Sequence, residues 1–249
     1  MDSAAYQNLL SLSEHQRLVG DAQALLSWDQ EVLLPPAGVE YRGKQMSWFS
    51  GWLHEEATRP EVGDWISEAE SLVGEEEGPE AEAVKANLRE WRRNYDRETK
   101  LPKRLVEDLA RVQTESKSAW AEARKVADFS KFAPHLETLI SLCREQAACW
   151  GFEGDRTYDG LIDKFEPGAD SARLSEILGE LRENLVPIVS EATARETFDE
   201  SRLEGHYPIE QQEAFNREVA EAIGFDFESG RIDTAVHPFC SGMAPHDVR

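Results

Sequence analysis

The clearest indication of the fold class comes from residues 84–112, which read Val84-Lys-Ala-Asn-Leu88-Arg-Glu-Trp91-Arg-Arg-Asn-Tyr95-Asp-Arg-Glu-Thr-Lys-Leu-Pro102-Lys-Arg-Leu105-Val-Glu-Asp-Leu109-Ala-Arg-Val112. The large apolar residues of this stretch recur every three or four positions, which places them on one face of a helix. Pro102 interrupts the pattern, and the same spacing then resumes because proline is tolerated where a helix starts. The stretch therefore predicts two helices, and we expect them to pack against each other as an antiparallel hairpin.

The same period runs through most of the chain outside this stretch. Apolar stripes predict further helices over residues 6–26, 39–56, from Pro60 to the acidic turn at 74–78, 132–150, 171–195 and 208–223. Pro35 to Gly38 ends the first of them, and Pro187 should kink the helix over 171–195 or divide it in two. No alternating pattern longer than a few residues occurs before position 225. The sequence predicts an all-α fold, or nearly so, with at most a short strand near the C-terminus, and residues 1–249 as one domain or part of one.

Composition excludes several classes of protein. The formal net charge is -22, with 49 acidic against 27 basic residues, which argues against a nucleic-acid partner. The N-terminus has no signal-peptide pattern, and nowhere do about 18 apolar residues run together. Three cysteines form no CxxC pair, and Cys143 and Cys149 are expected to be small buried residues on helices. We expect a soluble cytoplasmic protein with no membrane partner.

One motif comes close to a metal-binding pattern. His54-Glu55-Glu56-Ala57-Thr58 matches HExxH, in which two histidines four apart on one helix face ligate zinc, except that Thr58 replaces the second histidine. We interpret His54 as an ordinary helix residue. No complete metal site is predicted in this chain.

Two other features have a structural and a functional interpretation. Asp163 and Glu166 lie three apart, so their carboxylates could share a proton or bind a cation, but Pro167-Gly168 directly after them favours a role at a helix end. The seven tryptophans fall on or beside apolar stripes, for which packing at the core or between helices is the default: they are residues 28, 48, 52, 65, 91, 120 and 150.

The stretch Gly230 to Arg249 carries turn formers together with chemically capable side chains. Pro238 holds His237 extended, and Phe239 adds an aromatic face, so these residues form a rigid corner. Asp247 and Arg249 lie two apart and point the same way if the segment is extended. Such a pair could orient a carboxylate or a catalytic neighbour, or it could be a surface salt bridge worth at most about 1 kcal/mol.

These residues carry a family resemblance. His237-Pro238-Phe239 followed by Asp247-Val248-Arg249 resembles the HPF and DxRxT signatures of the M32 metallocarboxypeptidases, the thermostable carboxypeptidase Taq family. Further blocks resemble the family in the same order along essentially the whole chain: Trp28-Asp29-Gln30-Glu31 with the break at Pro35–Gly38, Arg42 and Gln45, then Leu53–Gly63, Tyr95–Pro102, Phe129–Leu139 and Tyr158–Gly168.

The resemblance implies a helical, cleft-shaped zincin that removes C-terminal residues from peptide substrates with zinc or another divalent metal. The family's HExxH lies beyond DxRxT, so residues 1–249 are expected to be the incomplete N-terminal half of a larger peptidase domain. No catalytic or metal-binding residue, no bound metal and no activity are expected of this chain alone.

His237, Pro238, Phe239, Asp247 and Arg249 are expected to line the substrate groove or to position other groups, and no role follows for Asp163 or Glu166. The resemblance also implies a homodimer in full-length form. The alternative is a catalytically inactive helical module for peptide binding or dimerisation.

Overall fold

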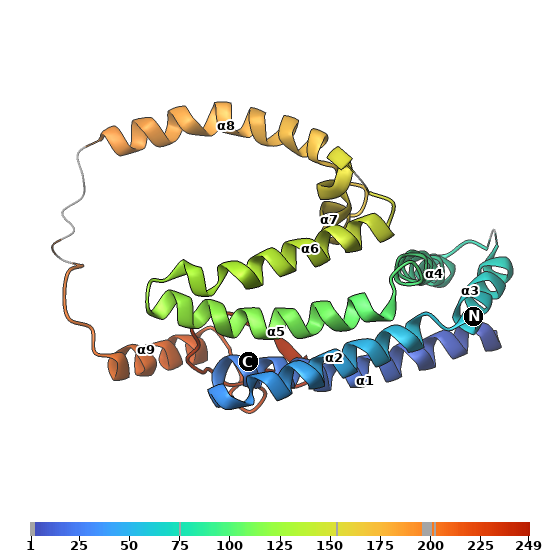
Figure 1. Cartoon of the computed structure of the whole chain (residues 1–249), viewed down its shortest axis with the longest axis horizontal. Coiled ribbons are helices and arrows are strands. Elements are labelled where there is room, and N and C mark those ends of the chain that lie inside the picture. Colours follow the sequence, from blue (N-terminus) through green and yellow to red (C-terminus); the bar gives the residue numbers. More distant parts are fainter. Residues whose placement is uncertain (1–2, 75, 153, 196–200, 202) are drawn as a thin grey trace. The chain divides into compact units, whose positions relative to one another are not determined.

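A computed structural model divides the chain into two compact units, Met1–Gly151 with Asp233–Arg249, and Phe152–Ile232. The structure describes residues 3–74, 76–152, 154–195, 201 and 203–249 (Figure 1). The two units are described separately below. That residues 1–249 are one incomplete part of a larger domain stays a prediction.

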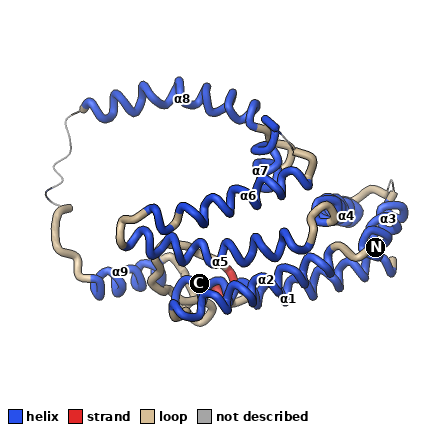
Figure 2. The backbone as a smooth tube through the Cα atoms, viewed as in Figure 1, coloured by secondary structure: helices blue, strands red, loops and turns tan. Residues whose placement is uncertain are grey.

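The first unit is helical apart from a small hairpin of strands near its C-terminus (Figure 2). Its elements are α1 (Ala4–Val32), η1 (Pro36–Gly38), α2 (Val39–Ala57), α3 (Pro60–Val73), α4 (Pro79–Glu98), α5 (Lys103–Lys125), η2 (Phe129–Lys131), α6 (Ala133–Cys149), β1 (Gly242–Ala244) and β2 (Asp247–Val248). The second unit contains η3 (Gly154–Arg156), α7 (Thr157–Phe165), α8 (Ser171–Ala194) and α9 (Ile209–Ala222). The predicted fold class, nearly all-α with a short strand near the C-terminus, is confirmed.

The helix ends follow from local chemistry. The Ser3 hydroxyl accepts a hydrogen bond from the amide of Tyr6 at 3.2 Å and so caps the start of α1. Pro60 and Pro79 occupy the first positions of α3 and α4, where the missing amide donor costs nothing. Gly74 follows α3 with φ of 42°, a conformation that other residues rarely adopt. The boundaries predicted from prolines and glycines therefore agree with the structure to within a few residues.

The main hydrophobic core of the first unit joins α1, α3 and α4. Leu9 from α1, Ile66 from α3 and Leu88 from α4 are at most 2% exposed. Tyr6 packs its ring against Trp91, with ring centroids 5.5 Å apart. Burying these side chains stabilises the fold by about 1.5–3 kcal/mol each.

The predicted hairpin of the helices over 84–112 is wrong. The apolar face of α4 packs against α3 and α1, whereas α5 packs mainly against α2 and then α6. Figure 1 shows α4 end-on while α5 runs across the view, so the turn at Lys100–Pro102 changes the direction of the chain. The spacing of the apolar residues located both helices correctly, but an apolar face on a helix does not specify which other helix packs against it.

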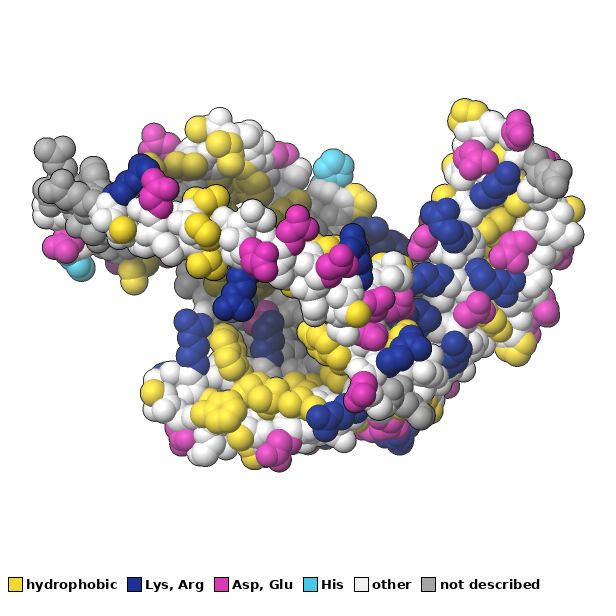
Figure 3. Space-filling view, turned by 90° about the horizontal axis from the view of Figure 1, so that it is seen from above, with side chains coloured by type: hydrophobic (Ala, Val, Ile, Leu, Met, Phe, Trp, Pro, Cys, Tyr) yellow, Lys and Arg dark blue, Asp and Glu magenta, His cyan; other side chains and the backbone are white. Residues whose placement is uncertain are grey.

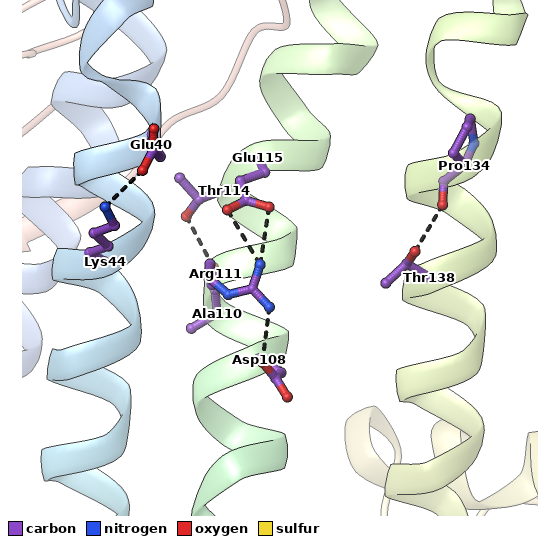
Figure 4. A network of polar contacts seen from close by, with 9 residues as sticks. All are labelled: Glu40, Lys44, Asp108, Ala110, Arg111, Thr114, Glu115, Pro134 and Thr138. Atoms are coloured by element: carbon purple, nitrogen blue, oxygen red, sulfur yellow. Dashed lines mark hydrogen bonds and ion pairs between the residues drawn. The ribbon is translucent and has the colours of Figure 1, made fainter.

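Close approach of α2 and α5 is possible because α2 presents glycines to its partner. A Cβ on Gly43 would lie 3.5 Å from Cγ of Arg111, and one on Gly51 would lie 2.9 Å from Cγ of Glu107. Figure 4 shows α2, α5 and α6 beside one another, with the polar side chains of α5 bonded along their own helix. There Arg111 donates to Asp108 at 2.9 Å and to Glu115 at 3.2 Å.

Several side chains depart from the expected burial. Trp28 and Trp150 are buried as expected, but Trp48 is 62% exposed, so packing in the core is the wrong interpretation for that tryptophan. Cys143 and Cys149 are half-buried rather than buried, and Cys240 is exposed. Large hydrophobic side chains stay at the surface beside charged ones (Figure 3). On α8 they include Ile177, Leu178, Leu181, Leu185, Val186, Ile188 and Val189.

The helix that contains Pro187 is continuous. α8 runs from Ser171 to Ala194 with the proline inside it, and Figure 1 shows a single bowed helix. Of the two outcomes expected from Pro187, division of the helix does not occur.

The contact between α3 and α4 yields a stability prediction. A Cβ on Gly63 would lie 2.8 Å from the hydroxyl oxygen of Tyr95 and 2.9 Å from its ring. Overpacking of this kind costs about 1–3 kcal/mol, which exceeds the gain of about 1 kcal/mol from the better helix propensity of alanine. Gly63→Ala should therefore lower the free energy of unfolding by about 1 kcal/mol net in urea titrations.

Gly20 is the matched control, because it also lies within a helix but a Cβ there would meet no atom within 4 Å. Gly20→Ala should raise the free energy of unfolding by up to about 1 kcal/mol. Equal effects of the two substitutions would contradict the close contact at Tyr95.

In the second unit, Asp159 links α7 to the start of α8. Hydrogen bonds from the hydroxyl and the amide of Ser171 lower the pKa of the Asp159 carboxyl, and the charge of Arg156 adds to the effect. The Ser171 amide donates at 2.9 Å. Because the pKa is lower in the folded state, the stabilisation is present above the unfolded value of about 3.9 and is lost as pH falls through the folded value.

We predict that a ¹³C NMR titration gives Asp159 a pKa below about 3.9 and that the Ser171 amide signal moves over the same pH range. Asp159→Asn should abolish this movement of the amide signal. A Ser171 signal that still titrates in the variant would show that another group is responsible.

Candidate functional site

The candidate residues near the C-terminus lie on a two-stranded antiparallel hairpin. β1 and β2 pair Gly242 with Val248 and Ala244 with Asp247. Beyond them, the amides and carbonyls of Ser241 and Arg249 exchange two hydrogen bonds of 2.8 Å. Pro245 and His246 form the turn, and His246 has φ of 60°, so a proline followed by a positive φ gives the features of a type II turn. The hairpin fixes the backbone on both sides of the Asp247–Arg249 pair.

The side chains of Asp247 and Arg249 meet on one side of β2. Nε of Arg249 donates to Oδ1 of Asp247 at 2.7 Å, and Nη2 donates to Oδ2 at 3.0 Å. Cζ of the Arg249 guanidinium lies over the Trp28 ring, 4.2 Å from the ring centroid. The Arg249 side chain is only 17% exposed. This two-bond, stacked geometry differs from a mobile surface salt bridge, because two neighbours fix the plane of the guanidinium.

The last turn of α1 contacts the hairpin through Trp28. Trp28 is 5% exposed and carries Arg249. The next residue, Asp29, accepts from Nη2 of Arg42 on α2 at 2.6 Å.

The two residues after Asp29 both reach α5. Gln30 donates to the carbonyl of Thr114 at 3.4 Å, and Glu31 pairs with Lys117 at 2.6 Å. Consecutive helix residues point about 100° apart, so Trp28-Asp29-Gln30-Glu31 reaches three different elements from one turn.

A pocket of about 410 Å³ lies between this turn, α5 and the hairpin. Its lining combines apolar side chains with the Glu31–Lys117 ion pair and with residues at the start of the hairpin. The lining residues are Ala24, Ser27, Trp28, Glu31, Lys117, Phe239, Ser241, Gly242 and Met243. Its size lies within the range of small-ligand pockets, and its mixed lining suits a group that is apolar with a polar end.

Of the three residues of the HPF corner, His237 and Phe239 point to different places. Phe239 lines the pocket, as Trp28 does. His237 instead lies against Trp120 of α5 in an edge-on arrangement, with ring centroids 6.4 Å apart. Arg124 lies over the same Trp120 ring at 5.5 Å and is 3.5 Å from the carbonyl of Val236. The structure therefore brings Asp247, Arg249 and Phe239 around Trp28 and places His237 at a second contact with α5.

Comparison with known proteins shows the family of the chain. The family model for the carboxypeptidase Taq (M32) metallopeptidases matches residues 8–249. The chain belongs to the M32 family. The M32 chain is 36% identical over 99% of its length to thermostable carboxypeptidase 1 of Thermus thermophilus and covers 50% of that protein. It is 30% identical over 92% of its length to carboxypeptidase 1 of Bacillus subtilis and covers 45% of it.

The fold of this M32 chain also matches a solved relative. The BsuCP crystal structure superposes with a TM-score of 0.91 at 27% identity, over 99% of this chain and 49% of that one. The chain thus spans about half the length of the curated relatives that it matches.

The near-miss motif of this M32 chain is occupied by structural contacts. His54 is 7% exposed, its Nδ1 lies 3.0 Å from Oε2 of Glu98, and its Nε2 lies 3.0 Å from the carbonyl oxygen of Leu101. The Thr58 hydroxyl donates to the His54 carbonyl at 2.7 Å. Both ring nitrogens of His54 therefore bind oxygen atoms, and the side chain ties α2 to the end of α4.

Asp163 and Glu166 lie at the end of α7, as the structural interpretation holds. Asp163 accepts a hydrogen bond from the amide of Gly168 at 2.8 Å, and Glu166 is the residue after the last turn of the helix.

Within the ranges that the structure describes, no three or more His, Cys, Asp or Glu side chains form a group able to hold a metal ion. The described side chains therefore do not provide the ligand set that the metal of a metallopeptidase requires. None of the described helices is long and apolar enough to cross a membrane.

The sequence assigned Trp28 to packing and did not connect it with the hairpin. The tryptophan is buried, so the packing interpretation holds, but its ring also contacts the guanidinium of Arg249. The run Trp28-Asp29-Gln30-Glu31 was the available signal, because three polar residues follow the tryptophan at the end of an apolar stripe. The partner 221 residues later could not be found by local spacing.

The contacts of His54 lead to a second stability prediction. His54→Ala leaves the carbonyl of Leu101 without its donor in a buried position, which should lower the free energy of unfolding by about 2 kcal/mol. Glu55→Ala is the neighbouring control, since it breaks only the exposed pair with Lys103 and should change stability by less than about 1 kcal/mol. Urea titrations of both variants measure the difference, and similar losses would contradict a special role for His54.

Proposed function

We propose that this chain supplies the helical scaffold and the groove-positioning residues of an M32 metallocarboxypeptidase. The activity, removal of C-terminal residues from peptides by metal-activated water, belongs to the whole protein. The curated relatives that match this chain are carboxypeptidases of about twice its length. Peptides are therefore the proposed substrates, and zinc or another divalent metal is the proposed cofactor of the full-length protein.

The observation that carries this proposal is the Asp247–Arg249 pair on Trp28. An arginine held by two hydrogen bonds and by an aromatic face presents its remaining N–H groups in a fixed direction. Fixed donors of this kind serve recognition of a peptide oxygen better than a mobile side chain does, because less conformational freedom is lost on binding. Asp247 and Arg249 are thus proposed as positioning residues of the groove.

The HPF corner has a proposed role beside them. Phe239 lines the pocket next to Trp28, where it offers an apolar contact to a substrate side chain. Pro238 restricts the backbone of His237, and the His237 ring contacts Trp120. We place His237 and Pro238 as the residues that hold Phe239 in position, and Phe239 as the groove-lining residue.

We propose further properties of the whole protein from the family and the charge. The proposed full-length form is a cytoplasmic homodimer. Acidic residues outnumber basic ones by 49 to 27, so nucleic acid is not a proposed partner.

For the chain of residues 1–249 we predict no stoichiometric zinc and no release of C-terminal residues from an N-blocked dipeptide. The reason is that no group of three metal-ligating side chains occurs among the described residues. Metal analysis of purified chain and an amino-acid release assay with added zinc check this, with thermostable carboxypeptidase 1 of Thermus thermophilus as the positive control. About one zinc per chain together with dipeptide cleavage would overturn the prediction.

A catalytically inactive peptide-binding module is the second candidate. The pocket of about 410 Å³ favours it, since a binding site needs no metal. The two candidates differ in the longer protein: a peptidase cleaves peptides when its metal is supplied, whereas a binding module retains them unchanged. Intact peptide after incubation with the metal-loaded full-length protein would support the module.

A further inference from the structure

We propose that Trp28 is a positioning residue for Arg249. In this arrangement the buried ring of Trp28 and the carboxylate of Asp247 fix the guanidinium so that its Nη1 edge meets an oxygen acceptor of a bound peptide. The inference rests on the proposed function and deepens it, because it assigns to a residue at the end of α1 the control of a binding group directly after β2.

The position of Trp28 itself is fixed by its neighbours in sequence. Trp28 is 5% exposed, so its ring has little room to change rotamer. Asp29 pairs with Arg42, whose side chain is 8% exposed and which also donates to the carbonyl of Leu26. These contacts hold the last turn of α1 against α2. A ring held in this way gives Arg249 a rigid surface rather than a mobile one.

The contacts of Arg249 leave one edge of its guanidinium for a ligand. Asp247 accepts from Nε and Nη2, and Cζ lies over the Trp28 ring at 4.2 Å from its centroid. Among the described residues, no hydrogen bond of this side chain engages Nη1. An Arg edge donates to carbonyl and carboxylate oxygens, which are the acceptors that a peptide offers.

Stacking also explains why the group is an arginine. A planar guanidinium lies flat on an indole ring and keeps its in-plane N–H groups for other partners, whereas an ammonium group would have neither the plane nor the fork. Trp28 therefore fixes the direction of the donors without consuming any of them. Asp247 by itself would leave the plane free to tilt about the two hydrogen bonds.

NMR of the arginine Nε–Hε groups of the chain tests the positioning. In the wild type, the Arg249 proton should be shifted upfield by the Trp28 ring current and should exchange slowly with water. Trp28→Phe should keep a smaller upfield shift, because an aromatic face remains. Trp28→Leu should remove the shift and speed up exchange at least tenfold. Trp48→Leu is the control, since Trp48 is 62% exposed and its ring neighbour is Phe49.

Far-UV circular dichroism shows whether each variant folds, and if Trp28→Leu does not fold, Trp28→Phe carries the test. An Arg249 signal that is the same in the wild type and in the folded Trp28 variants would overturn the positioning role. Loss of the signal in Trp48→Leu would also overturn it, because the effect would then not come from the Trp28 ring.

Titration with an N-blocked dipeptide separates this inference from the proposed function. The wild-type Arg249 signal should move on binding, and Trp28→Leu should weaken the affinity about fivefold, as expected for loss of one stacking contact. Equal affinity in the two proteins would overturn the role of Trp28 in binding. Absence of binding to the wild type would count against peptide recognition by Arg249, and so against both proposals. If the ring-current shift were still present in that case, the contact between Arg249 and Trp28 would nevertheless be established.

Discussion

The last turn of α1 is the constraint on which the candidate site depends. Within one helical turn, Trp28 carries Arg249, Asp29 binds Arg42 and Glu31 binds Lys117. Helix geometry spreads consecutive side chains around the axis, so a single short segment can connect α2, α5 and the hairpin. The Asp29–Arg42 pair is costly to break, because the Arg42 side chain is only 8% exposed and would lose its charged partner. The hairpin has only two short strands and depends on this support.

The contacts of His54 play a comparable role at the other end of α2. A histidine in a nearly complete zinc motif binds Glu98 and the carbonyl of Leu101. Nearby, Arg97 lies over the Trp150 ring at 3.9 Å, and the indole nitrogen of Trp150 donates to the Arg97 carbonyl at 3.3 Å. The end of α4 is thus joined to α2 and α6 through side chains. This explains how α4 can pack against α3 and still be connected to the bundle of α2, α5 and α6.

Much of the site could be predicted from the sequence, and the reasons for the exceptions are physical. The spacing of Asp247 and Arg249 placed both side chains on one side of an extended segment, and they are bonded there. The interpretation of Asp163 as a helix-end residue agrees with its bond to Gly168. The stacking of Arg249 on Trp28 could not be predicted, because residues far apart in sequence are brought together only by the packing of α1 against the hairpin.

The helices, their boundaries and the family can be inferred from the sequence, since apolar period, proline and glycine act locally and the motifs occur in a fixed order. Which helices pack against each other depends on tertiary packing. The stretch 84–112 gives two correct helices, yet α4 packs on α3 and α5 on α2, because glycines on α2 allow α5 to approach closely. A stripe specifies that a face must be buried, whereas the shapes of all the faces together select the element that buries it.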